Sequence, residues 1–172
     1  AYKEGNLPKM NEKYGGSRVY KNPDKIIGAL KNEKHRIVAQ LQKEYGLRIR
    51  EANLIKKEQL VGENKIVLTK AGTKGGRIRQ VEVSKQLYED VKAIIEKEGR
   101  FYVSQNHYRE DLKETCQQLQ EDYYGTHGLR WNYAQEQHQE NMENGMTYEQ
   151  SLNETSEKMG HSRADITEHY LK

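Results

Sequence analysis

The 172-residue chain has little of several residue types that mark particular classes of protein. Its one cysteine, Cys116, excludes an internal disulfide and favours a reducing, intracellular setting. A mean hydropathy of −1.12 excludes a run of about 20 apolar residues that could cross a bilayer. The first ten residues have no apolar stretch after a basic start, so we expect no secretory signal peptide.

Charge and aromatic content point only weakly to a partner. The chain has 29 Lys and Arg against 26 Asp and Glu, a net charge of +3, and a pI near 8.8. This lies below the pI of about 9 that would by itself indicate a nucleic-acid-binding domain. The 12 tyrosines and 32% charged residues are compatible with disorder, but regular apolar spacing predicts a folded domain.

The spacing predicts one domain over residues 23–172, preceded by a basic linker over residues 1–22. The linker has no helical or strand period, and its basic residues are Lys3, Lys9, Lys13, Arg18 and Lys21. We expect it to come from an N-terminal DNA-binding domain that this sequence does not include.

Helical period and capping residues predict most of the secondary structure. A first helix begins at Asn22-Pro23, and a second ends at Gly46. The remaining predicted helices cover 47–55, 84–99, about 106–124, 127–144, 147–160 and 162–172.

Two β-branched segments interrupt the helices. Residues 65–69 (KIVLT) and 77–83 (RIRQVEV) flank the glycine-containing sequence KAGTKGG, which predicts a β-hairpin. The fold class expected is therefore mainly α with one small antiparallel sheet.

Three motifs carry candidate chemistry: G-L-R-I-R-E over residues 46–51, H-G-L-R over 127–130, and G-H over 160–161 followed by Tyr170 nine residues after the histidine. Together with a hairpin lysine, and in this order, they resemble the tyrosine recombinase (phage integrase) family. The resemblance covers roughly residues 23–172 and implies the family's DNA breaking and rejoining fold.

The resemblance implies a role for each matching residue. Arg48 and Arg130 correspond to the two active-site arginines, His127 and His161 to the histidines, and Tyr170 to the nucleophile. Lys74 matches the catalytic lysine best, with Lys70 as the competing choice. The DNA-binding residues implied are those of the hairpin: Lys70, Lys74, Arg77 and Arg79.

The chemistry of phosphodiester cleavage suits these residue types. Guanidinium groups stabilise the charge that develops on phosphoryl oxygens without a metal. The pKa of a free tyrosine is near 10, so a histidine or the arginines must assist ionisation of Tyr170. A hairpin lysine suits protonation of the 5′ leaving oxygen, and a 3′-phosphotyrosyl link conserves the bond energy for rejoining.

Each assignment has a structural alternative. Arg48 and Glu51 could form an ordinary surface ion pair, and Lys74 could be a solvated turn residue. His127, His161 and Tyr170 could serve packing or capping alone. A metal site is disfavoured because the histidines lack ligand spacing backed by cysteine.

We therefore predict a site-specific DNA recombinase catalytic domain from a prophage or mobile element, an enzyme with no cofactor. The resemblance implies double-stranded DNA as partner, a homotetramer on DNA, a monomer when free, and a bacterial cytoplasmic, DNA-associated location. The alternatives are a type IB topoisomerase-like enzyme and a non-catalytic DNA-binding regulator. Two departures from the family pattern are Trp131-Asn132 after the second arginine and a long polar segment before His161.

Overall fold

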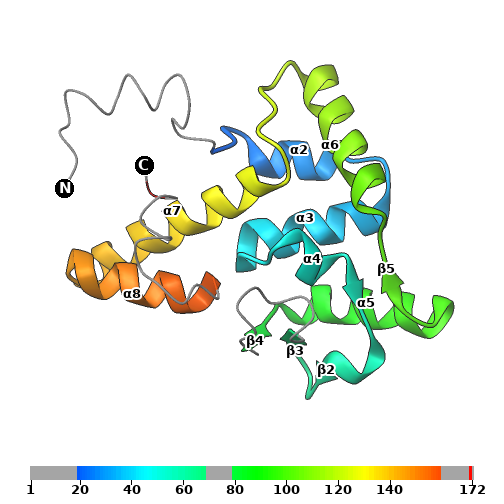
Figure 1. Cartoon of the computed structure of the whole chain (residues 1–172), viewed down its shortest axis with the longest axis horizontal. Coiled ribbons are helices and arrows are strands. Elements are labelled where there is room, and N and C mark those ends of the chain that lie inside the picture. The colour runs from blue at the N-terminus through cyan, green and yellow to red at the C-terminus, as the bar shows by residue number, and fades with distance from the viewer. Residues whose placement is uncertain (1–18, 69–78, 160–170, 172) are drawn as a thin grey trace.

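The computed structural model describes residues 19–68, 79–159 and 171. Helices form most of this part of the chain, with two small antiparallel sheets at one side (Figure 1). The expected class, mainly α with a small antiparallel sheet, is confirmed, although the strands form two sheets rather than one. In the described ranges no helix is long and apolar enough to cross a membrane.

The first helix begins, and the second helix ends, where the sequence predicts. Helix α2 (Pro23–Ala29) starts after Asn22, and α3 (Glu33–Tyr45) starts after Asn32, whose side chain accepts from the amide of Lys34. Gly46 ends α3 in the left-handed region, with φ of 73°. The apolar faces of both helices lie in the main core.

The short helix expected over residues 47–55 is wrong in its second half. Helix α4 (Ile49–Ala52) is a single turn, and β1 (Leu54–Ile55) follows it. Strand β1 pairs with β5 (Phe101–Tyr102), almost 50 residues later, with Ile55 opposite Phe101. The local sequence pattern therefore produces only one helical turn, because pairing with a distant strand favours β structure in the residues that follow.

The predicted hairpin is present and belongs to a larger sheet. Strands β3 (Lys65–Leu68) and β4 (Arg79–Glu82) are antiparallel, with Leu68 opposite Arg79 at the last described pair. Strand β2 (Leu60–Val61), after the 3₁₀ turn η2 (Lys57–Gln59), pairs with the other edge of β3. The hairpin's turn, including Lys70, Lys74 and Arg77, lies outside the described residues.

The later helices follow the predicted capping signals. Helix α5 (Lys85–Glu98) runs from Ser84 to Gly99, and α8 (Tyr148–Met159) begins at a capping box in which Thr147 and Gln150 bond each other's amides. Helix α7 (His127–Glu143) is also as expected. Helix α6 (Gln105–Leu119) ends earlier than predicted, because Gln120 adopts a left-handed φ of 58°. The predicted last helix, 162–172, falls almost entirely outside the described ranges.

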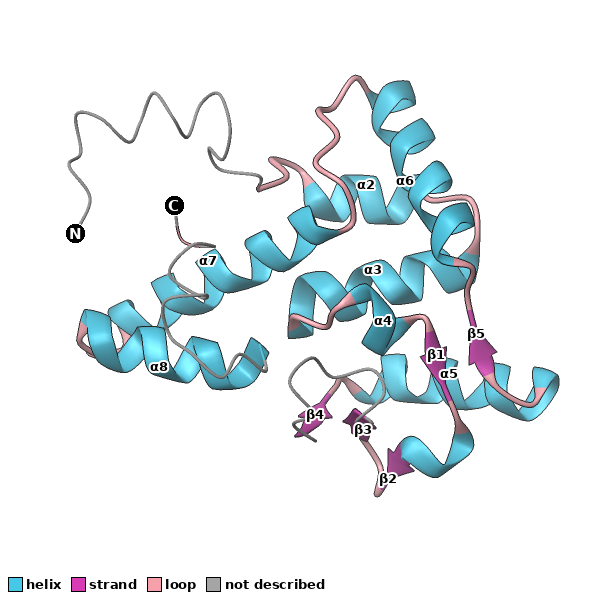
Figure 2. Ribbon diagram, in the orientation of Figure 1, coloured by secondary structure: helices cyan, strands magenta, loops and turns pink. Residues whose placement is uncertain are grey.

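Two apolar clusters hold these elements together. The larger one is formed by α2, α3, α5, α6 and the strands, and the smaller one contains Trp131, Tyr133, Ala134 and Met159 where α7 meets α8. Figure 2 shows α7 and α8 side by side, set off from the strands. Val19 and Leu171 both pack on the smaller cluster, so two segments from opposite ends of the chain meet there.

Tyr20 belongs to the core, although the sequence places it in the linker. Its side chain is 2% exposed, and its hydroxyl donates to the carbonyl of Gly125 across 2.6 Å. The side chain of Asn132 bonds both the amide and the carbonyl of Tyr20, each at 2.9 Å. The composition of residues 1–22 therefore did not indicate that Tyr20 is buried. The contacts with Tyr20 also give a structural reason for Asn132, which departs from the family pattern.

Candidate active site

Arg48 stands at the start of α4 and is held by Glu51. The Arg48 amide donates to Glu51 Oε1 across 2.8 Å, and Arg48 Nη1 lies 3.3 Å from Glu51 Oε2. The Glu51 side chain is 0% exposed and that of Arg48 is 12% exposed. This pair is therefore not the solvated surface ion pair that was the structural alternative for Arg48.

A second arginine reaches the same carboxylate from the sheet. Arg79, the first residue of β4, places Nη1 2.6 Å from Glu51 Oε2 and Nη2 3.2 Å from Oε1. This two-pronged geometry is the strong form of an arginine–carboxylate pair. The sequence predicts DNA binding for Arg79, and that role stays a prediction.

Arg130 joins two of the three motifs from within α7. Its side chain is 1% exposed; Nε donates to the carbonyl of Gly46 across 2.7 Å and Nη2 to that of Met159 across 2.8 Å. Gly46 precedes Arg48 by two residues, so their Cα atoms are at most about 7 Å apart. Met159 precedes His161 by two residues. Arg130 thus connects the segments that lead into the other motifs.

His127 is the first residue of α7 and lies on the surface. It precedes Arg130 by three positions, which places both side chains on the same face of the helix. The structure thus brings the first half of the H-x-x-R motif to the protein surface and the second half to its interior.

Gly46 and Tyr133 fit closely beneath this arrangement. Gly46 has a φ of 73°, and a Cβ there would lie 2.5 Å from Tyr133 Cδ2. Burial raises the pKa of Tyr133 to about 12, even though the positive charges of Arg79 and Arg130 lower it. Tyr133 is therefore a poor competitor for the role of nucleophile despite its nearness to the arginines.

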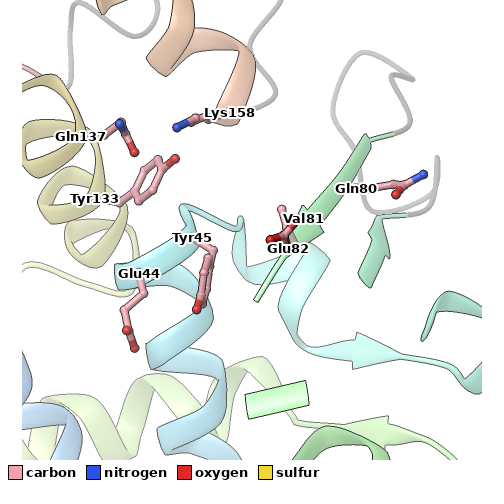
Figure 3. Close-up of a pocket in the computed structure, with 8 residues that line it drawn as sticks. All are labelled: Glu44, Tyr45, Gln80, Val81, Glu82, Tyr133, Gln137 and Lys158. Carbon is pink, nitrogen blue, oxygen red and sulfur yellow. The ribbon is translucent and has the colours of Figure 1, made fainter. Parts of the chain in front are cut away.

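A pocket of about 380 Å³ opens beside Tyr133 and was not predicted (Figure 3). Tyr45 of α3, Val81 of β4 and Lys158 of α8 also line it, and the Tyr133 hydroxyl points toward Lys158. The apolar spacing of α7 gave no indication that Tyr133 would line a pocket. Glu51 was the other residue missed as a site component, although it is part of the G-L-R-x-x-E motif.

The structure leaves several predicted residues undescribed. Arg48, Arg79, His127 and Arg130 are placed, and the others lie outside the described residues: Lys70, Lys74, Arg77, His161 and Tyr170. Leu171, which follows Tyr170 in the sequence, packs against the cluster that contains Trp131 and Met159. Within the ranges that are described, no group of three His, Cys, Asp or Glu side chains is arranged to hold a metal ion.

Comparison with known proteins identifies the family of this chain. A family model described as Integrase matches residues 19–136, more than half of the chain. The chain belongs to the integrase family. No curated protein matches its sequence significantly.

Solved structures show that this integrase-family chain has the fold of a tyrosine recombinase catalytic domain. A lambda integrase dimer bound to a core site matches with a TM-score of 0.67 and 14% identity, over 91% of this chain and 48% of that one. The XerH recombinase in a post-cleavage complex with its difH substrate gives 0.66 and 16%, over 87% and 47%. The Tn1549 transposon integrase with circular intermediate DNA gives 0.62 and 15%, over 96% and 61%. The chain thus spans about half the length of the first two structures.

Proposed function

We propose that this chain is the catalytic domain of a site-specific tyrosine recombinase that cuts and rejoins DNA during integration or excision of a mobile element. The observation that carries the proposal is the pair of hydrogen bonds from Arg130 to Gly46 and Met159. They draw the segments before Arg48 and His161 onto the first turn of α7. Three motifs that are far apart in the sequence then serve one site.

In the proposed reaction the Tyr170 phenolic oxygen attacks a backbone phosphorus atom. The phosphorus–O5′ bond breaks, and the DNA strand becomes attached to the enzyme through a 3′-phosphotyrosyl bond. The phenolic proton passes to His127 or His161, and Lys74, or Lys70 in its place, protonates the departing 5′ oxygen. Arg48 and Arg130 stabilise the charge on the other phosphoryl oxygens.

Reversal of this step with a 5′-hydroxyl from another strand would complete recombination without ATP, because the phosphotyrosyl bond keeps the energy of the broken bond. The proposed partner is double-stranded DNA, contacted in part by the hairpin residues Lys70, Lys74 and Arg77. We further propose that four copies assemble on DNA and that the free protein is a monomer. No cofactor or metal ion takes part in the proposed chemistry.

A covalent adduct with DNA tests this proposal directly. The chain is incubated, in the presence of a chelator, with a pool of nicked duplexes of randomised sequence. Cleavage next to the nick releases a short DNA fragment that diffuses away, so the strand cannot be rejoined and the enzyme stays attached to the DNA. Adducts are separated on a denaturing gel, and the attached peptide is identified by mass spectrometry. We expect an adduct on Tyr170 in the wild-type chain and none in Tyr170→Phe.

The matched control is Tyr102→Phe, which removes the hydroxyl of an exposed tyrosine on β5. It should form as much adduct as the wild type. An adduct that persists in Tyr170→Phe, or DNA binding by the wild type without any adduct, would overturn the proposal. The second of these results would favour a non-catalytic regulator, and adduct formation with DNA relaxation but no strand exchange would favour a topoisomerase.

A further inference from the structure

We infer that Arg79 is a positioning residue that acts through Glu51 to hold Arg48 in place for strand cleavage. The inference rests on the proposed function and deepens it. It assigns to Arg79 a different role from the DNA contact that its place in the basic hairpin predicts.

The geometry of Arg79 argues against a DNA contact. Both of its terminal nitrogens bind the Glu51 carboxylate, and Nε is buried without a hydrogen-bond partner in the described part of the structure. Arg48 binds the Glu51 carboxylate through one terminal nitrogen, whereas Arg79 binds it through both. The guanidinium of Arg79 is directed inward, onto a carboxylate that has no exposed surface.

Both oxygens of Glu51 are shared between the two arginines. Oε2 lies 3.3 Å from Arg48 Nη1 and 2.6 Å from Arg79 Nη1. Oε1 accepts from the Arg48 amide at 2.8 Å and from Arg79 Nη2 at 3.2 Å. Arg79 therefore sets the plane of the carboxylate, and that carboxylate in turn orients both the backbone and the side chain of Arg48.

Charge gives Arg79 a second effect on Arg48. Two guanidiniums and one carboxylate carry a net charge of 2 − 1 = +1. Without Arg79, Arg48 and Glu51 would form a neutral pair, and the site would lose positive potential where negative charge develops on the phosphoryl oxygens in the transition state. With Arg79 present, Glu51 can orient Arg48 while the three side chains together keep a positive charge.

Arg79 also stands at the base of the hairpin. It lies opposite Leu68 in the last described pair of β3 and β4, next to the segment that contains Lys70 and Lys74. Its bond to Glu51 consequently fastens the hairpin to the start of α4. One side chain thus connects the Arg48 helix with the two strands that flank the candidate lysines in the sequence.

The test separates cleavage from binding in the full chain. Arg79→Gln and Arg79→Lys are compared with the wild type for single-turnover adduct formation at saturating DNA, for the Kd, and for its salt dependence. We expect Arg79→Gln to slow adduct formation about 10²-fold, the cost of a misplaced catalytic group, with the Kd and salt slope unchanged. Arg79→Lys should recover part of the rate, since it restores the charge and one of the two contacts.

The matched control is Arg36→Gln, which removes a partly buried arginine that donates to the carbonyl of Leu30, away from Glu51. It should lower thermal stability without changing the rate per folded molecule. Arg79→Gln should have no further effect in a Glu51→Gln background, because the two residues act in series.

Two results would overturn the inference. A raised Kd with a salt slope smaller by about 0.9, and an unchanged saturating rate, would make Arg79 a phosphate ligand. A loss of stability like that of Arg36→Gln, with the rate per folded molecule unchanged, would make it a purely structural residue. If the wild type itself forms no adduct, the proposed function fails, whereas adduct formation that is insensitive to Arg79→Gln refutes only this inference.

Discussion

The Nε atom of Arg130 donates a hydrogen bond to the carbonyl oxygen of Gly46 across 2.7 Å, joining residues 84 positions apart. The same guanidinium donates to Met159 at the end of α8. A buried guanidinium is expensive to desolvate, and the two carbonyls offset part of that cost. Arg130 is thus a structural link between motifs as well as a candidate phosphate ligand.

Arg130→Lys should therefore impair both stability and cleavage. A single ammonium group cannot reproduce the planar fork that serves two carbonyls, so one buried acceptor loses its partner. We expect a loss of about 1–3 kcal/mol in the free energy of unfolding and a drop of at least about 10²-fold in adduct formation. Urea denaturation and single-turnover cleavage measure the two effects.

The control for Arg130→Lys is Arg109→Lys on α6, since Arg109 is exposed and donates to the side chains of Asn106 and Gln105 on its own helix. It should change neither quantity. If Arg130→Lys were as stable as the wild type, the guanidinium would not be needed to link Gly46 and Met159.

Gly46→Ala should damage the site through the backbone. Its φ of 73° disfavours any residue with a Cβ by about 1–2 kcal/mol, and that atom would lie 2.5 Å from the Tyr133 ring. The shift needed to relieve the contact would also move the carbonyl that Arg130 binds. We expect lower stability by urea denaturation together with slower adduct formation.

Gly28→Ala is the matched control for this substitution. Gly28 lies in α2, and a Cβ there would meet no atom within 4 Å. The change should leave cleavage unaltered and raise stability by up to about 1 kcal/mol, since alanine favours the helix. Equal losses in the two variants would contradict the steric argument for Gly46.

Local signals in the sequence predict much of this fold. The caps at Asn32, Ser84 and Thr147 and the stop at Gly46 act within one helical turn, so they can be read without the rest of the chain. The roles predicted for Arg48, His127 and Arg130 come instead from the resemblance of their short motifs to those of the family.

Contacts between segments that are distant in the sequence cannot be predicted from such local signals. Strand β1 pairs with β5 from a distant part of the chain, and the buried Tyr20 bonds Asn132 and Gly125, which are more than 100 residues away. Arg79 is similar: its basic neighbours predict a DNA contact, and nothing local indicates that Glu51 binds it. The sequence therefore predicts candidate site residues, but it does not predict the contacts that hold Arg48 and Arg79 in position.

Tyr20→Phe tests how firmly the chain before α2 is fastened to the start of α7. The substitution keeps the ring but removes a hydroxyl that donates to the Gly125 carbonyl at 2.6 Å and accepts from the Tyr124 amide at 3.0 Å. We expect a loss of about 1–3 kcal/mol in the free energy of unfolding, because two backbone groups lose their partner. Hydrogen exchange of the Tyr124 amide should become faster.

Tyr88→Phe removes the corresponding hydroxyl of another buried tyrosine, which donates only to the Gly62 carbonyl across 3.0 Å. It should have a smaller effect on stability and none on exchange at Tyr124. Unchanged exchange in Tyr20→Phe would show that other contacts hold the segment before α7.

Asp111 predicts a pH dependence of stability. Burial disfavours its ionisation, but hydrogen bonds from His35 and from the amides of Lys31 and Asn32 outweigh burial and lower the pKa of Asp111 below 3.8. A carboxyl group whose pKa is lower in the folded state stabilises the protein above its unfolded-state pKa. That stabilisation disappears as the pH falls through the folded-state pKa.

Asp111→Asn should therefore be less stable than the wild type at pH 7, by about 1–3 kcal/mol, and the difference should shrink as the pH falls below 4. Urea denaturation of both proteins between pH 7 and the most acidic pH at which both fold measures this difference directly. Asp24→Asn, which changes a carboxyl group that is 86% exposed, should match the wild type closely at neutral pH. A difference between Asp111→Asn and the wild type that stays constant down to the lowest pH would contradict the prediction, because a pH-independent loss reflects the shape of the side chain and not its charge.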